Sequence, residues 1–135
     1  MSSPGSLENP YDLIGGAPVV RKLVEHFYDA MERTEPELTR LHACDAEGRV
    51  SRESRDRFAL FLIGWLGGPQ AYTERHGHPR LRMRHARVPV SVTMRDAWLR
   101  SMTIAMDEVE IAPSLRAYLE PRLAEVANFL RNHPG

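Results

Sequence analysis

The sequence predicts an all-α domain, for three reasons. Four segments place apolar residues three and four positions apart, which is the spacing of amphipathic helices. No segment shows a convincing alternation of apolar and polar residues of the kind that a half-buried strand requires. The chain has 135 residues, the size of one domain with a single hydrophobic core. We therefore expect four principal helices packed into one unit.

Composition argues against several kinds of partner and location. The 18 basic and 18 acidic side chains cancel, so the net charge gives no reason to expect nucleic acid or an anionic membrane. A single cysteine, Cys44, cannot form an internal disulfide, which fits a reducing compartment. No apolar run approaches the roughly 18 to 20 residues of a membrane span, and the polar start lacks the apolar core of a secretion signal. We expect a soluble, cytoplasmic protein.

The N-terminal part is predicted to hold a loose leader and one helix. Residues 1–10 are rich in Ser, Pro, Gly and Asn and have little to bury, so we assign them to a flexible leader before a domain over 11–135. After a short apolar turn and two glycines, the spacing predicts a helix over 18–34 with Glu25 and Asp29 on its outer side. The residues expected to face the core are Val20, Leu23, Val24, Phe27, Tyr28 and Met31.

A second helix is expected over 51–66, because a serine opens the periodic run and Gly67–Pro69 stops it. One wide aromatic face of this helix holds Ser54, Phe58, Phe61, Leu62, Trp65 and Leu66. The segment 38–48 before it has a weak pattern and is predicted to be loop. Leu41 and His42 are its candidates for burial.

Two more helices are expected in the C-terminal part. A connection over 70–77 holds Tyr72, and a long helix begins near residue 91 and breaks at 111–113. The final run over 115–130 also has helical spacing but contains Pro121. A proline there indicates either one kinked helix or a short turn followed by a helix that starts near Pro121.

The most unusual stretch is HGHPRLRMRHARVPV, from His76 to Val90. It carries three of the six histidines, four arginines and no acid, and two prolines bracket its centre. A short helix would place Leu81 one turn above His85, although the alternation of Leu81, Met83 and His85 also fits a strand; the prolines favour the helix. A neutral imidazole can bind iron while the surrounding guanidinium groups meet carboxylates. A flat, anionic, iron-bearing cofactor needs this combination.

Haem meets that description, with His85 as its axial ligand and the opposite iron face left for a gas. Three side chains with polar tips on otherwise apolar faces, Tyr28, His42 and Trp98, are candidate donors to a bound diatomic ligand. The residues expected to pack against the macrocycle are Phe27, Phe58, Phe61 and Leu62.

Each of these residues also has an interpretation without a ligand. Buried Tyr and Trp usually have a hydrogen-bond partner in any case, so Tyr28 and Trp98 also fit plain core positions. His42 also fits a solvent-exposed loop position, and the arginines also fit a solvent-exposed basic surface. His76 and His78 could chelate a metal, but they lack a third ligand nearby. No catalytic triad order, phosphate loop or paired carboxylates stand out.

Several motifs resemble the truncated haemoglobins, in particular their group II. The run GGPQAYTERHGHPRLRMRHARVPV over 67–90 and the later RDAWL over 95–99 are similar to motifs of that group. YDLIGG over 11–16 and HFYDAM over 26–31 are similar to the family's first two helical signatures. The resemblance spans about residues 10 to 131. It implies a shortened globin fold, a two-over-two α-helical sandwich around a haem b.

The resemblance also implies roles for single residues. His85 becomes the proximal haem ligand, Tyr28 and Trp98 line the ligand side, and His42 contacts the distal haem edge. Phe58 departs from the smaller or more flexible residues that relatives often carry, so it would narrow the pocket. The other implied haem contacts are Tyr72, His78 and Arg82 on the propionate side, with Leu81 and Met83 beside the proximal histidine.

Three functions fit this sequence. The first is reversible binding of O2 or another diatomic gas at the haem iron. The second is a haem redox enzyme, a nitric oxide dioxygenase or a peroxidase-like protein; it would need a separate reductase, because the sequence contains no flavin or nicotinamide domain. The third is a haem-free helical interaction module, which would be colourless. The sequence fits either a monomer or a homodimer.

Overall fold

The structure is a computed structural model that describes residues 9–76 and 91–130. Within these ranges the regular elements are helices, and the extended pairing is one isolated antiparallel bridge between Cys44 and Val50. The elements are α1 (Pro10–Ile14), α2 (Ala17–Thr34), α3 (Pro36–Thr39), α4 (Arg52–Trp65), α5 (Ala71–His76), α7 (Val92–Glu108) and α8 (Pro113–Leu130). The all-α prediction is confirmed. None of the described helices combines the length and the apolar character that crossing a membrane requires.

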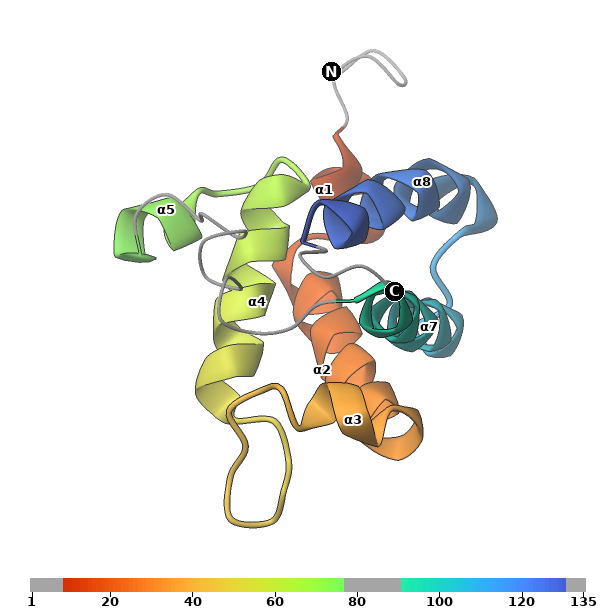
Figure 1. Cartoon of the computed structure of the whole chain (residues 1–135). Coiled ribbons are helices and arrows are strands. Elements are labelled where there is room, and N and C mark those ends of the chain that lie inside the picture. Colours follow the sequence, from red (N-terminus) through yellow and green to blue (C-terminus); the bar gives the residue numbers. More distant parts are fainter. Residues whose placement is uncertain (1–8, 77–90, 131–135) are drawn as a thin grey trace, which may run out of the picture.

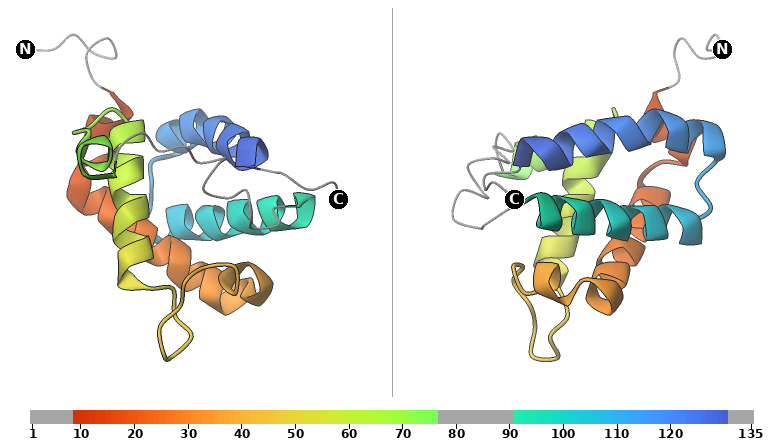
Figure 2. Two further views of the ribbon diagram at one scale, coloured as in Figure 1. Left: turned by 60° about the vertical axis from the view of Figure 1, so that its left-hand side comes forward. Right: turned by 45° about the vertical axis from the view of Figure 1, so that its right-hand side comes forward.

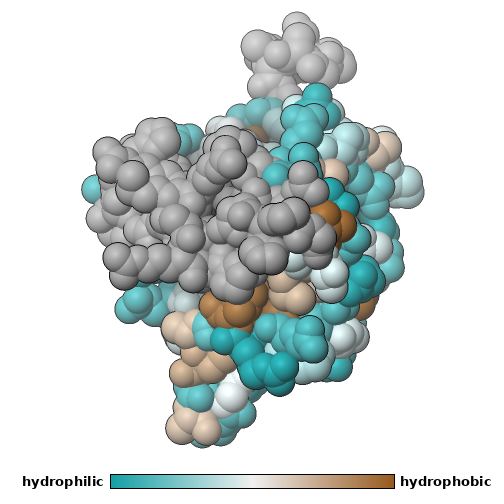
Figure 3. Space-filling model, viewed as in Figure 1, coloured by the Kyte–Doolittle hydropathy of each residue, from teal (hydrophilic) through white to brown (hydrophobic). Residues whose placement is uncertain are grey.

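The four long helices form two crossed pairs. α2 packs along α4, and α7 lies beside α8 (Figure 1). The two turned views in Figure 2 show the α7–α8 pair crossing the α2–α4 pair, with α2 also packed on α7. This is the two-over-two sandwich that the sequence led us to expect. Where the space-filling view in Figure 3 is coloured, the surface is largely hydrophilic, with small hydrophobic patches near the centre of the view.

The long helices form where the apolar spacing predicted them. In α2 the core residues include Val20, Phe27 and Met31, each 0% exposed. The side chains of Ser51 and Ser91 cap α4 and α7 by accepting hydrogen bonds from backbone N–H groups three residues later. Each cap satisfies a donor that the first turn of a helix leaves without an intrahelical partner, which is why these helices begin where they do.

The short helices were not predicted. α3 and α5 occupy segments that we expected to be loop and connection. They have four and six residues, too few for a period of 3.6 to be recognised. In α3, Leu38 and Thr39 are buried, so the prediction that only Leu41 and His42 are candidates for burial in this segment is wrong.

The last helix runs without a break through its proline. α8 begins at Pro113 and contains Pro121 inside it, so the alternative of a helix starting near Pro121 is wrong. Proline cannot donate a backbone hydrogen bond, which leaves a carbonyl in the preceding turn without its usual donor. That carbonyl belongs to Ala117; the next one, of Tyr118, accepts a hydrogen bond from the Arg122 side chain at 2.8 Å.

Gly67 and Gly68, just after α4, lie in close contact with α1 and with Asn9 before it. The backbone N–H of Tyr11 donates to the carbonyl of Leu66 at 3.0 Å, and the Asn9 side chain donates to the carbonyl of Gly67 at 2.9 Å. The Tyr11 ring lies directly on Gly68: a Cβ atom on that glycine would lie 2.6 Å from Cδ1 of the ring. The Gly-Gly pair that stops α4 therefore also lets α1 approach it closely.

We expect Gly68→Ala to destabilise the protein by about 1 to 3 kcal/mol, the usual cost of forcing an extra methyl group into a packed site. The measurement is the free energy of unfolding in urea. In a Tyr11→Ala background the ring is gone, so the same glycine substitution should cost much less. An equal cost in both backgrounds would contradict the steric explanation.

Candidate functional site

Aromatic rings from four helices and one loop meet between the helix pairs. This aromatic cluster consists of Phe27 and Tyr28 of α2, His42 of the loop after α3, Phe58 and Phe61 of α4, Tyr72 of α5 and Trp98 of α7. All seven were predicted to contact the haem or its ligand. Most of the pairs meet edge to face, the favoured geometry for aromatic rings at these centroid distances.

Phe58 lies in the middle of the cluster. Its ring centroid is 5.4 Å from that of Phe27, 5.9 Å from that of Tyr28 and 6.2 Å from that of Trp98. The bulky side chain thus packs against both of the predicted polar residues, Tyr28 and Trp98. The narrowing of the pocket by Phe58 stays a prediction.

The predicted haem contacts differ in how deeply they are buried. Phe27 and Leu62 are 0% and 3% exposed and belong to the core, whereas the rings of Phe58, Phe61 and Trp98 are only half-buried. The Tyr72 ring is buried and meets the Phe61 ring edge-on at 6.0 Å. Phe61 also lines a cleft of about 570 Å³ between α4 and α8, which the other described haem-contact candidates do not line.

Two hydrogen-bond donors in the cluster have no partner in the described part of the chain. They are the hydroxyl of Tyr28 and the indole N–H of Trp98. Burial raises the pKa of Tyr28 well above its ordinary value of 10.0, and the nearby charge of Arg55 opposes this only in part. The phenol therefore keeps its proton at neutral pH and remains a donor.

His42 differs from these two residues because its ring is tied to the backbone. Its Nδ1 atom lies 3.0 Å from the carbonyl oxygen of Leu38. A carbonyl only accepts hydrogen bonds, so Nδ1 carries the proton in this bond. The donor role of His42 toward a ligand stays a prediction.

Five predicted site residues lie outside the described ranges. They are His78, Leu81, Arg82, Met83 and His85. Their roles stay predictions from the sequence, as does the short helix expected between the two prolines.

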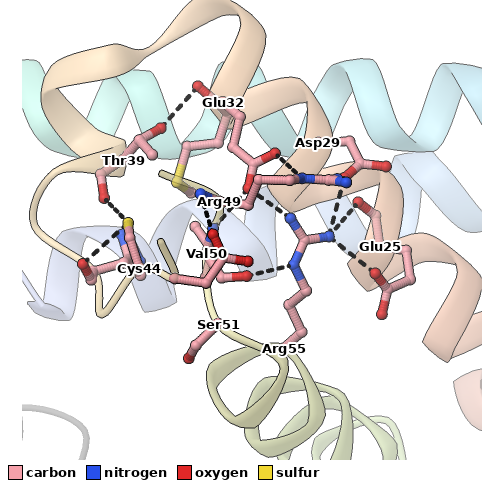
Figure 4. Close-up of polar contacts among 12 residues, drawn as sticks. Glu25, Asp29, Glu32, Thr39, Cys44, Arg49, Val50, Ser51 and Arg55 are labelled. Carbon is pink, nitrogen blue, oxygen red and sulfur yellow. Dashed lines mark hydrogen bonds and ion pairs between the residues drawn. The ribbon is translucent and has the colours of Figure 1, made fainter. Parts of the chain in front are cut away.

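A charge network that the sequence pattern had not indicated joins α4 to α2 (Figure 4). Arg55 of α4 points toward α2, where its guanidinium group donates to Glu25, Asp29 and Glu32 at 2.9, 3.0 and 2.6 Å. Glu25 and Asp29 are 34% and 38% exposed, so they lie partly on the outer side of α2, as expected, and they also bind buried Arg55. A signal was present: the three carboxylates are spaced four and three residues apart, and Arg55 shares a stripe of α4 with buried Ala59 and Leu62.

This network makes stability depend on pH. Burial alone would raise the pKa of Glu25, but the hydrogen bonds and charges of Arg52 and Arg55 outweigh it and hold the pKa below the ordinary value of 4.5. A carboxyl whose pKa is lowered by folding stabilises the folded state above its unfolded pKa and loses that contribution as the pH falls through its folded pKa.

We therefore expect Glu25→Gln to lower the free energy of unfolding at pH 7 and to lower it progressively less as the pH falls below 4.5 and through the lowered pKa of the folded wild-type carboxyl. Urea unfolding of both proteins at several pH values measures the difference. If the difference in the free energy of unfolding between the two proteins stays constant from pH 7 to pH 3.5, the charge of Glu25 does not contribute to stability.

The two crossed helix pairs, with an aromatic cluster between them, define the class of this protein as a two-over-two helical globin. The family model for bacterial-like globins matches residues 9–132. A group 2 truncated hemoglobin of Bacillus subtilis (strain 168), YjbI, is 35% identical over 127 residues, covering 94% of this chain and 91% of the relative. The chain belongs to the bacterial-like globin family, and its relatives place it among the group II truncated haemoglobins.

Solved structures agree with this assignment. The crystal structure of the group II truncated hemoglobin from Bacillus anthracis matches with a TM-score of 0.87 at 32% identity, covering 99% of this chain and 96% of that one. The X-ray structure of a truncated oxygen-avid haemoglobin from Bacillus subtilis matches with a TM-score of 0.82 at 36% identity, covering 93% and 100%. The resemblance seen in the sequence motifs is thereby confirmed.

Proposed function

We propose that this globin reversibly binds O2 or another diatomic gas at a haem b held by His85. The observation that supports this most directly is the pair of donors, the Tyr28 hydroxyl and the Trp98 indole N–H, that have no partner in the described part of the chain. Haem supplies the iron to which a gas binds, and the protein supplies the surroundings of that gas. A structural match that is described as oxygen-avid supports O2 as the ligand.

The residues present suit a haem. The half-buried rings of Phe58, Phe61 and Trp98 offer flat apolar surface to a flat macrocycle. The group is anionic through its propionates, and the sequence around His85 provides guanidinium groups to meet carboxylates. An imidazole ligand on one side leaves the other side open to a gas.

The two donors account for retention of the ligand. Bound O2 gains negative charge, so a donor aimed at it makes a charge-assisted hydrogen bond worth about 1.5 to 3 kcal/mol. Each 1.4 kcal/mol changes an equilibrium constant about tenfold, so two such bonds slow escape by about a hundredfold or more. The rings of Phe27 and Phe58 exclude water around these bonds, which strengthens them.

An absorption spectrum of the purified protein in its ferric, ferrous and oxygenated forms tests this function. We expect a haem band in the near ultraviolet that shifts on reduction and shifts again on exposure to O2, then returns when O2 is removed. A colourless protein that gains no such band when haemin is added would refute haem binding. A ferrous haem that O2 oxidises at once, without a stable oxygenated form, would refute reversible binding.

A further inference from the structure

Arg55 is a buried cation on a helix stripe that is otherwise apolar. Its side chain is 4% exposed, less than that of any acidic partner in its network. A charge removed from water is tolerated only when it is paired and hydrogen-bonded. Burial alone would lower the pKa of Arg55, but its bonds to Asp29 and Glu25 and the charge of Glu32 hold the pKa above its ordinary value. Arg55 therefore stays charged in its buried position.

The bonds of Arg55 fix the orientation of its guanidinium group. Nη1 donates to one carboxylate oxygen each of Glu25 and Asp29, and Nη2 donates to Glu32. Nε donates to the carbonyl of Val50, in the loop before α4, at 3.0 Å. Because the guanidinium fork is planar and rigid, bonds from all three nitrogens leave it little freedom to turn.

This fixed cation lies against the ring of Tyr28. The Cζ atom of Arg55 is 5.5 Å from the ring centroid of Tyr28, within the range of a cation–π contact. Tyr28 is three residues after Glu25 and four before Glu32, so it projects from α2 close to the stripe that Arg55 binds. The ring is thus held by Arg55 in addition to its aromatic neighbours.

The same network holds the loop that carries His42. Glu32 accepts a hydrogen bond from the backbone N–H of Val50 at 2.7 Å and one from Nε of Arg49 at 3.1 Å. Val50 closes that loop through its bridge to Cys44. One set of charges therefore joins α2, α4 and the loop, the three elements that carry Tyr28, Phe58 and His42 (Figure 4).

We propose that Arg55 is a positioning residue for gas binding: it holds the Tyr28 ring where its hydroxyl can donate to the ligand. This role rests on the proposed function, because it concerns the same donor. Arg55 itself does not touch the ligand in this proposal. It acts through the position of Tyr28.

The test compares three variants of the haem-loaded protein by stopped-flow O2 dissociation. Arg55→Met removes the positive charge and the planar guanidinium group but keeps a long side chain. We expect O2 to dissociate about three to ten times faster from this variant. Arg55→Lys keeps the charge without the fork and should give a smaller increase. Arg52→Met is the matched control: Arg52 also pairs with Glu25, but its side chain is 64% exposed, so the wild-type rate is expected. A wild-type rate in both Arg55 variants would overturn the proposal.

A double-mutant cycle shows whether Arg55 acts through Tyr28. In a Tyr28→Phe background, Arg55→Met should add no further acceleration; equal acceleration in both backgrounds would overturn the proposal. If Tyr28→Phe alone accelerates dissociation and the Arg55 variants do not, only the role of Arg55 fails. If Tyr28→Phe changes nothing, the proposed distal donor fails and the role of Arg55 fails with it.

A second measurement does not depend on gas kinetics. In protein labelled with ¹³C in its tyrosine rings, the Tyr28 ring signals should move or broaden in both Arg55 variants and stay unchanged in Arg52→Met. The lysine variant keeps this test available if the methionine variant does not fold, since it retains the buried charge. Unchanged Tyr28 signals in a folded Arg55 variant would overturn the proposal.

Discussion

Replacing His85 with alanine is expected to abolish stable haem binding, or to leave the iron without its protein ligand. The expectation comes from the sequence, in which His85 is the histidine flanked by apolar residues and surrounded by arginines. An iron held through an axial imidazole loses its main bond to the protein when that ring is removed. Haem content after gel filtration and the ferrous absorption spectrum measure the loss.

His26→Ala serves as the control for this variant. The His26 ring pairs with Glu108 at 2.8 Å on a partly exposed edge between α2 and α7. We expect it to keep its haem and its spectrum. If His85→Ala also retained haem with an unchanged spectrum, the proximal ligand would have to be another residue.

Tyr28→Phe and Trp98→Phe are each expected to raise the O2 dissociation rate by about ten- to a hundredfold. Each substitution removes one donor and keeps an aromatic ring, although Trp98→Phe also makes the side chain smaller; the lost donor corresponds to about one charge-assisted hydrogen bond. Tyr28 loses only its hydroxyl, which the buried ring keeps protonated at neutral pH. Because both donors would address one ligand, the double variant should be non-additive.

Stopped-flow O2 dissociation from the ferrous protein measures these rates. Tyr11→Phe is the matched control: it removes a tyrosine hydroxyl in α1, outside the aromatic cluster, that accepts a hydrogen bond from the backbone N–H of Ala17 at the start of α2. The control should keep the wild-type rate. Wild-type rates in both Tyr28→Phe and Trp98→Phe would exclude these side chains as donors to the ligand.

Much of the fold follows from local features of the sequence. The spacing of Val20, Phe27 and Met31 determined the buried face of α2, and serines at 51 and 91 determined where α4 and α7 begin. Such features act within one or two turns, so they can be recognised in a single sequence. The same holds for the motifs that indicated a group II truncated haemoglobin.

The candidate site could be predicted in part. Tyr28, Phe58 and Trp98 were chosen as polar or aromatic residues on inner helix faces, and the structure brings their rings together. The hydrogen bond of the His42 ring to the carbonyl of Leu38 was less predictable, because it depends on a one-turn helix that the apolar spacing did not indicate.

The sequence by itself determined the long helices, the inner faces that carry the aromatic residues, and the family. Only the tertiary structure decided that Arg55 is buried against Glu25, Asp29 and Glu32, which lie 30, 26 and 23 residues away in the chain. It also decided that Gly68 must stay small beneath Tyr11. The physical reason is that periodicity specifies which face of a helix is buried, whereas the partner of each buried side chain depends on how the helices pack against one another.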